Sequence, residues 1–217
     1  VTILSGARIG KNCRIFPGAV IAAIPQDLKF NNEYSTVEIG DNTTIRECVT
    51  VNRGTVDKHK TTVGNNCLLM AYVHVAHDVS IGDHCIIANL ASIAGHVIID
   101  DHVIIEGIVG IQQFIRVGRF AFLSGGSKVR KNIPPFVKAA RDPLVYAGVN
   151  SVGLKRNGYT SDKVKAIEDI YRVLYVQNSN LSKGIADVKK NLSQNPYSKE
   201  ILDFIKTSEN GVIKGMV

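Results

Sequence analysis

Aliphatic side chains recur at every sixth position along most of the chain between Ile3 and Val129. A second position, two residues before each of these, carries a small or aliphatic side chain, as at Cys67, Val73 and Ala91. The residues in this phase are Ile3, Ile9, Ile15, Ile21, Ile39, Ile45, Val51, Val63, Leu69, Val75, Ile81, Ile87, Ile93, Ile99, Ile105, Ile111, Val117, Leu123 and Val129.

A repeat of six fits neither an amphipathic helix nor a simple strand, because their apolar side chains recur at about 3.6 and 2 residues. It indicates short strands separated by turns that wind the chain about a common axis. Three such units per coil would stack residues 18 apart at about 4.8 Å, the usual spacing of paired strands. We therefore predict a mainly β fold, a parallel solenoid with inward aliphatic ladders. The period does not define the hand of the coil.

The repeat is interrupted twice. Asp27, Glu33 and Asp57 fall in the inward phase, where a buried charge would be too costly. We therefore predict two excursions from the coil, near residues 22–36 and 52–62. Loops that leave a rigid scaffold are favoured places for binding residues.

Helical patterning follows the repeat, which ends at Pro134 and Pro135, since proline cannot donate to a strand ladder. We expect Ser161 and Ser198 to cap helices. The apolar residues of the three expected helices are Val164, Ile167, Ile170, Tyr171 and Leu174; Ile185, Val188 and Leu192; and Ile201, Leu202 and Ile205. We predict a β-solenoid over residues 1–145, followed by a connector and a C-terminal α-helical domain over residues 146–217.

The N-terminal end of the predicted solenoid has no capping element, because Val1 and Ile3 are already in phase. An open solenoid end would expose apolar surface and unpaired strand edges. We therefore expect the natural protein to have further N-terminal coils that this chain lacks.

The composition of the chain bears on its core, on membrane insertion and on its cellular compartment. The chain of 217 residues has no tryptophan and only 6% aromatic residues, so aliphatic side chains must fill the core. No apolar run approaches the roughly 20 residues that cross a bilayer, so we expect no stable membrane insertion. Four cysteines without a CxxC pair and a start unlike a signal peptide favour a reducing cytoplasm.

Basic residues outnumber acidic ones, giving a net charge of +7. Between Arg116 and Arg156 nine basic residues accompany one acid, Asp142. This cluster is either a solvated face or a landing surface for an acidic protein or a phosphorylated ligand. Nucleic acid binding is not supported, because the sequence shows no aromatic stacking set or recognised module.

The stretch AYVHVAHD at residues 71–78 places two histidines before an aspartate. None of the six histidines falls on either inward ladder, which leaves surface polarity or a functional site. Counting 18 residues forward from His77 leads to Gly95 and then to Gln113. A glycine above the imidazole avoids crowding and leaves a backbone N–H beside it, an arrangement suited to acyl transfer.

Two other chemistries are less consistent with the predicted solenoid. His74 would project from a flat face and His77 from the next corner, so they do not converge on one zinc ion unless another subunit adds a ligand. Cys13, Cys67 and Cys85 occupy inward positions, where a thiol is an unreactive filler.

The chain contains, in this order, the stretches IPQDLKF (24–30), IRECVTVNRGT (45–55), HVAHD (74–78), AGHV (94–97), QQF (112–114) and GVNSVGLKRNG (148–158). Together they resemble UDP-N-acetylglucosamine O-acyltransferases, the enzymes that begin lipid A biosynthesis in Gram-negative bacteria. The resemblance implies a left-handed parallel β-helix and a cytoplasmic homotrimer with active sites between subunits. It implies transfer of a 3-hydroxyacyl group from acyl carrier protein to the 3-hydroxyl of UDP-N-acetylglucosamine, without a metal or other cofactor.

The resemblance also implies roles for individual residues. His77 matches the general base, Asp78 the carboxylate that orients it, and Gly95 the backbone amide near the thioester carbonyl. Gly125 matches the position where side-chain size limits the acyl chain, and a glycine there suggests a long chain. Substrate-lining positions are matched by Asp27, Lys29, His74, His96, Gln113, Asn150 and Arg156. The chain departs from the best-known members at Asn52, Gln112, Val152 and Asn157, where those carry His, His, Glu and Arg.

Three alternatives stay open on sequence grounds. The related UDP-3-O-acyl-glucosamine N-acyltransferase also uses hexapeptide coils, and the stretches QDLKF and GLKRNG favour the O-acyltransferase. A zinc enzyme of the γ-carbonic anhydrase type would contain stoichiometric metal. A non-catalytic β-helical scaffold would need neither the polar excursions nor the gap at Gly95.

Overall fold

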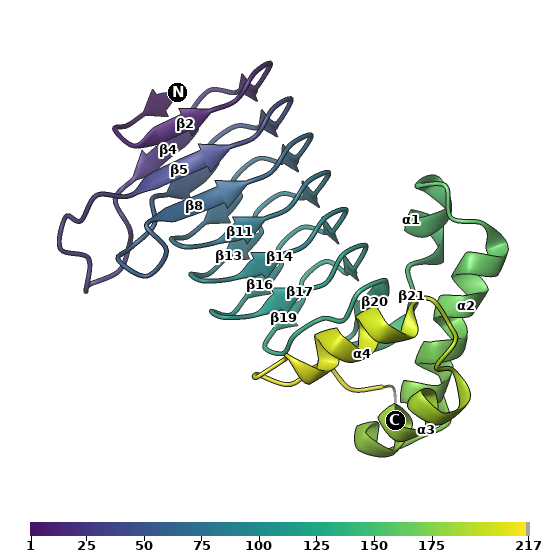
Figure 1. Cartoon of the computed structure of the whole chain (residues 1–217). Helices are drawn as coiled ribbons and strands as arrows, with labels where there is room; N and C mark the ends of the chain where they lie inside the picture. Colours follow the sequence, from purple (N-terminus) through teal and green to yellow (C-terminus); the bar gives the residue numbers. More distant parts are fainter. Residues whose placement is uncertain (216–217) are drawn as a thin grey trace.

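The chain folds into a three-sided coil of parallel strands with helices at one end (Figure 1). The structure is a computed structural model, and it describes residues 1–215. The sides are a seven-stranded, a six-stranded and an eight-stranded sheet, here called sheets A, B and C. Successive strands pass from one sheet to the next, so each sheet collects every third strand of the coil.

The strands are short, and most contain two residues. Sheet A contains β1 (Thr2–Ile3), β4 (Val20–Ala23), β7 (Thr50–Asn52), β10 (His74–Val75), β13 (Ser92–Ile93), β16 (Gly110–Ile111) and β19 (Lys128–Val129). Sheet B contains β2 (Ala7–Ile9), β5 (Thr36–Ile39), β8 (Lys60–Val63), β11 (Ser80–Ile81), β14 (Ile98–Ile99) and β17 (Arg116–Val117). Sheet C contains β3 (Arg14–Ile15), β6 (Thr44–Ile45), β9 (Leu68–Leu69), β12 (Ile86–Ile87), β15 (Ile104–Ile105), β18 (Phe122–Leu123), β20 (Val137–Ala140) and β21 (Val145–Val149).

The strand register confirms the predicted repeat. His74 pairs with Ser92 and Ile81 pairs with Ile99, each 18 residues further along the chain. The in-phase aliphatic residues from Ile21 to Val129 are buried, and they form one continuous core. Burying this apolar surface at roughly 25 cal/mol per Å² is the main favourable contribution to the fold.

The corners of the coil have a characteristic backbone conformation. At each corner a residue adopts a left-handed backbone, as at Asp78 (φ 60°), His96 (φ 63°) and Phe114 (φ 63°). Such a conformation costs roughly 1–2 kcal/mol for a residue other than glycine. Backbone hydrogen bonds between tiers oppose this cost, for example from His96 N to the His77 carbonyl at 3.1 Å.

Both predicted excursions are present, as loops of residues 24–35 and 53–59. Each leaves the coil at the corner between sheets A and B, after β4 and β7. Val20 pairs with Thr50, and Thr50 with His74, so sheet A continues past both loops, with a shift of register between Ile21 and Ala23 where the first loop begins. The next coil turns this same corner at His77 and Asp78.

The C-terminal part packs on the same core. β20 extends sheet C beside β18, and β21 turns back antiparallel to it. Four α-helices and one π-helical segment follow within residues 1–215, and Figure 1 shows α4 near β19 and β20, with the other labelled helices further out beyond β21. They are α1 (Ser151–Arg156), α2 (Ser161–Tyr171), η1 (Arg172–Val176), α3 (Leu181–Asn191) and α4 (Ser198–Lys206). The division into two domains at residue 145 stays a prediction.

The two predicted helix caps are wrong by one residue. Thr160 caps α2, and its hydroxyl accepts from the Lys163 N–H, whereas Ser161 is already helical. Ser198 lies inside α4, and its hydroxyl donates to the Leu192 carbonyl at 2.7 Å. No helix within residues 1–215 has the length and apolar character needed to cross a membrane.

Candidate active site

His77 and Asp78 occupy the corner between β10 and β11. The His77 Nδ1 and Asp78 Oδ2 atoms are 2.8 Å apart. The exposed fraction is 6% for His77 and 0% for Asp78, yet neither lies on the inward ladder, which runs through Val75 and Ile81. The imidazole is therefore neither a core residue nor a solvent-exposed one. Gly95 lies against the ring, and Thr55 and Lys58 of the loop of residues 53–59 contact the adjacent Asp78.

The Asp78 carboxylate is held by four hydrogen bonds. Its Oδ1 accepts from the backbone N–H groups of Thr55 at 3.0 Å and Lys58 at 3.2 Å. Its Oδ2 accepts from the Thr55 hydroxyl at 2.6 Å and from His77. Burial opposes ionisation, but the hydrogen bonds from Thr55 and His77 outweigh it and lower the pKa of Asp78. The ionised carboxylate holds a proton on His77 Nδ1, which leaves Nε2 as the basic atom.

Gly95 lies directly above the imidazole, as the sequence predicted. A Cβ atom at this position would be 2.6 Å from Cε1 and 2.7 Å from Nε2 of His77, so only glycine leaves room for the ring. Among residues 1–215 the Gly95 N–H has no hydrogen-bond acceptor. A basic nitrogen and an unpaired amide donor therefore lie next to each other.

A hollow of about 430 Å³ opens beside this pair on the face of sheet A. His74 is also part of its wall, and its Nδ1 is 2.7 Å from the Thr50 hydroxyl. Burial, and then the neighbouring His77, lower the pKa of His74, which keeps it neutral near pH 7. The polar side chains around the hollow are Gln26, His74, His77, Ser92, Gln112 and Gln113.

His96 faces away from this hollow. Its Nδ1 is 3.0 Å from Asp57 Oδ2 in the loop of residues 53–59, and its Nε2 is 3.9 Å from Asp78. The ring stacks on Phe114 at 4.5 Å. A second hollow, of about 440 Å³, is lined in part by His96, Asp57 and Phe114. The role of His96 in substrate binding stays a prediction.

Asn150 and Arg156 lie on another face of the chain. They contribute to a hollow of about 430 Å³ between sheet C and α1. The Asn150 side chain donates to the Phe120 carbonyl at 3.0 Å and accepts from the Gly153 N–H at 3.1 Å, so it fixes the start of α1. Among the predicted substrate residues, Asn150 and Arg156 are thus separated from His74 and Gln113, which border the hollow on sheet A.

Three further predicted residues lie outside these hollows. Asp27 and Lys29 belong to the loop of residues 24–35, where Asp27 Oδ1 accepts from the Lys29 N–H at 3.0 Å. Gly125 lies at the corner between sheets C and A, and a Cβ atom there would be 3.3 Å from the Gly107 carbonyl. A larger side chain at Gly125 would therefore project from a tightly packed position.

Within residues 1–215, one group of side chains has potential metal-ligand atoms close enough to bind the same ion. The atoms belong to His77, Asp78 and His96 and lie within 4.8 Å of one another. The Asp78 carboxylate already accepts four hydrogen bonds. The geometry therefore suits a hydrogen-bonded relay better than a metal centre.

Arg119, which lies in the basic cluster between Arg116 and Arg156, is paired within the chain. Its guanidinium pairs with Glu200 of α4 at 2.5 Å and donates to the Tyr159 hydroxyl. Arg116 stacks on Phe204 of the same helix at 4.7 Å. These two cations attach α4 to the coil, whereas Lys128 and Arg130 are exposed.

Sequence reasoning missed the contribution of the second excursion. Thr55, Asp57 and Lys58 contact the His77–Asp78 corner or His96. Gln26 of the first excursion borders the sheet A hollow. The break in the repeat at Asp57 predicts where the loop lies in the sequence. The repeat does not predict that this loop contacts Asp78.

The parallel coil with its histidine, carboxylate and unpaired amide defines a hexapeptide-repeat acyltransferase. Residues 60–95 match the family model "Bacterial transferase hexapeptide (six repeats)", and residues 132–213 match "Udp N-acetylglucosamine O-acyltransferase; Domain 2". The acyl-[acyl-carrier-protein]–UDP-N-acetylglucosamine O-acyltransferase of Chlorobaculum parvum is 50% identical over 207 residues, which are 95% of this chain and 78% of the relative. The enzyme of that name from Sulfurihydrogenibium is 49% identical over 201 residues, covering 92% and 74%. The chain belongs to the acyl-[acyl-carrier-protein]–UDP-N-acetylglucosamine O-acyltransferase family.

Solved structures agree with this assignment. The UDP-N-acetylglucosamine acyltransferase of Bacteroides fragilis is 49% identical, with a TM-score of 0.94 over 98% of this chain and 83% of that one. The Francisella novicida enzyme is 33% identical, with a TM-score of 0.89 over 98% and 90%. These matches confirm the left-handed β-helix that the resemblance implied.

Proposed function

We propose that this chain transfers a 3-hydroxyacyl group from acyl carrier protein to the 3-hydroxyl of UDP-N-acetylglucosamine, the first step of lipid A biosynthesis in the cytoplasm. The family supports the reaction, and one observation supports the mechanism: His77 Nε2 lies against Gly95 while Nδ1 is held by Asp78. A general base next to an oxyanion donor is what acyl transfer requires.

The reaction then proceeds by direct attack. His77 Nε2 takes the proton of the sugar hydroxyl, whose oxygen attacks the thioester carbonyl. The Gly95 N–H stabilises the oxyanion of the tetrahedral intermediate. As the carbon–sulfur bond breaks, His77 returns the proton to the leaving thiol, and neither a covalent acyl-enzyme nor a metal takes part.

The active unit is a homotrimer in this proposal. In one chain the base lies on sheet A and the Asn150–Arg156 hollow on the sheet C side, so a neighbouring copy would complete the site. The corner between sheets C and A also exposes Tyr72 by 59%, Leu90 by 53% and Ile108 by 68%. An apolar strip of this kind is typical of an interface.

The proposed reaction has two binding partners, acyl carrier protein and UDP-N-acetylglucosamine. Acyl carrier protein is acidic, and the exposed Lys128 and Arg130 offer charge complementarity at an exposed surface. UDP-N-acetylglucosamine would be bound by Asp27, Lys29, His74, His96, Gln113, Asn150 and Arg156. Gly125, which adds no side chain, favours a long acyl chain.

The test is an assay with 3-hydroxyacyl carrier proteins of graded chain length and UDP-N-acetylglucosamine, with the linkage of the product determined. We expect an ester at the 3-hydroxyl. His77→Gln should lower kcat by about 10² to 10⁴ with little change in KM. His84→Gln, an exposed histidine at another corner, serves as the matched control and should retain activity. Near-normal turnover by His77→Gln would refute the assignment.

A further inference from the structure

We propose that Thr55 is a positioning residue for the catalytic pair, and that the loop of residues 53–59 acts as a fixed clamp on the Asp78 carboxylate. This inference rests on the proposed roles of His77 and Asp78. It assigns a function to the second excursion, which the repeat pattern identifies only as an interruption.

Three of the four hydrogen bonds to the Asp78 carboxylate come from this loop. Thr55 supplies two of them, one to each oxygen, through its backbone N–H at 3.0 Å and its hydroxyl at 2.6 Å. Lys58 supplies the third through its backbone N–H at 3.2 Å. Two-point contact by Thr55 fixes the rotation of the carboxylate, and with it the direction of the bond to His77.

The Thr55 hydroxyl is itself oriented. Its oxygen lies 3.3 Å from the Asp57 N–H, from which it accepts, so its own proton is directed to Asp78. The contact is buried, because Thr55 is 6% exposed and Asp78 is fully buried. Water therefore has little access to replace a lost hydroxyl, and an unsatisfied buried acceptor is costly.

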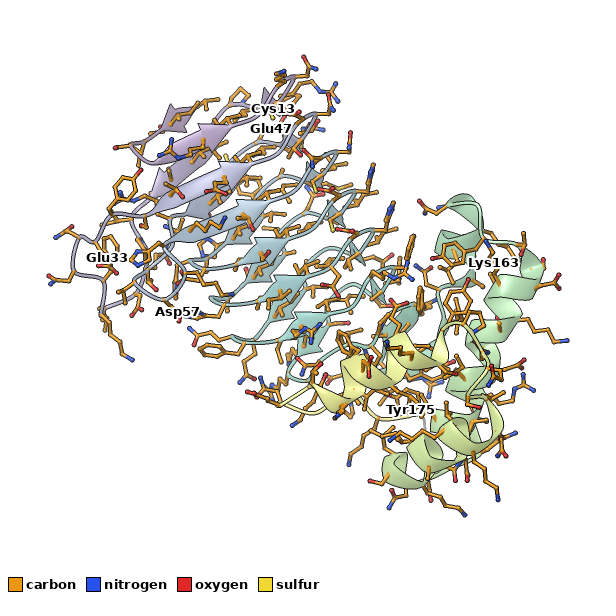
Figure 2. All side chains as sticks on the ribbon, viewed as in Figure 1. Cys13, Glu33, Glu47, Asp57, Lys163 and Tyr175 are labelled. Carbon is orange, nitrogen blue, oxygen red and sulfur yellow. The ribbon has the colours of Figure 1, made fainter. Side chains whose placement is uncertain are left out.

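The loop is tied to the coil by two further contacts, both made by residues that follow Thr55. Asp57 Oδ2 lies 3.0 Å from His96 Nδ1 in the tier above, and Figure 2 shows Asp57 on the loop beside the coil. The Lys58 ammonium donates to the Asp78 backbone carbonyl at 3.0 Å. These ties hold Thr55 against the carboxylate, as expected for a rigid clamp.

Asp78 acts through His77, so a loss at Thr55 should appear in the chemical step. Thr55→Val keeps the shape of the side chain and replaces the hydroxyl by a methyl group. We expect kcat to fall about 10- to 100-fold, the range for supporting partners of a reactive group, with KM for UDP-N-acetylglucosamine changed little. Thr55→Ser restores the hydroxyl and should return kcat to within about threefold of the parent.

A double-mutant cycle separates positioning from general damage. If Thr55 acts only through Asp78, Thr55→Val should add no further loss in an Asp78→Asn background. The matched control is Thr43→Val, which removes a buried hydroxyl with two hydrogen bonds, to the Gly64 carbonyl and from the Cys67 N–H, at another corner. This control should leave kcat unchanged.

A second measurement does not depend on turnover. The His77 Nδ1 proton should give a slowly exchanging, downfield N–H signal by NMR, present in the parent and in Thr55→Ser but lost in Thr55→Val. If His77→Gln is inactive while Thr55→Val keeps both its kcat and this signal, the clamp is refuted and the proposed function stands. If His77→Gln is fully active, the proposed role of His77 as the general base fails, and the signal alone then decides whether Thr55 positions the pair.

Discussion

At the scale of single residues, the proposed chemistry depends on the contact between Gly95 and the His77 ring. The glycine is needed for space, because its backbone φ is not in the left-handed region while a Cβ atom would overlap the ring. Its two predicted features, the gap and the unpaired N–H, are both present. The helix caps were misplaced at the same scale, since Thr160 and Ser161 have the same hydrogen-bonding capacity and only the backbone geometry distinguishes them.

Gly95→Ala tests this contact directly. The added methyl group would lie 2.7 Å from His77 Nε2, so the ring must move away from the substrate hydroxyl and the amide. We expect kcat to fall about 10²-fold or more, the cost of losing an oxyanion donor. Steady-state kinetics measure this loss, and unchanged thermal unfolding would show that the fold survives. An alanine variant with parental kcat would contradict the proposed geometry.

At the scale of elements, the repeat predicted the strands, the corners and the places where loops leave the coil. It did so because one buried ladder imposes one phase on the whole coil. It did not predict the short helix α1 or the return strand β21, because neither carries the period. The repeat predicted the position of the loop of residues 53–59 but not its contacts. The conformation of a loop depends on hydrogen bonds, which an apolar pattern does not predict.

His102, in the aromatic stack at the corner between sheets B and C, gives the folding stability of the coil a pH dependence. His102 lies between His84 at 4.7 Å and Phe120 at 4.5 Å. Burial, and then His84, lower the pKa of His102. The unfolded chain therefore binds this proton first as the pH falls below about 6.5, and folding stability decreases from there downward.

His102→Phe should weaken this dependence. Phe114 and Phe120 already adopt the same left-handed backbone, so phenylalanine fits the corner and extends the aromatic stack. We expect the decrease in Tm between pH 7.5 and pH 5.5 to be smaller in the variant. Part of it should remain, because the pKa of His74 is lowered as well. An identical decrease in both proteins would show that His102 does not contribute.

At the scale of the whole molecule, the sequence predicted a solenoid with helices at one end, and the structure has this form (Figure 1). The period of the sequence alone could not show that the proposed site residues lie on different faces of the chain. The motifs around His77 and Arg156 are far apart along the chain, and only folding places one on sheet A and the other beside α1. In the proposed site, a second copy of the chain would bring them together.

Mixed trimers test the divided site most directly. In the proposed trimer each cleft takes His77 from one chain and Arg156 from the neighbouring chain. A trimer made only of His77→Gln chains therefore lacks the base in every cleft, and a trimer made only of Arg156→Glu chains lacks the guanidinium in every cleft. Coexpressed as mixed trimers, the two variants should recover about one quarter of the parental activity, because random assembly places an intact His77 opposite an intact Arg156 in that share of clefts. Activity no greater than that of the two variants alone would contradict a site shared between neighbouring chains.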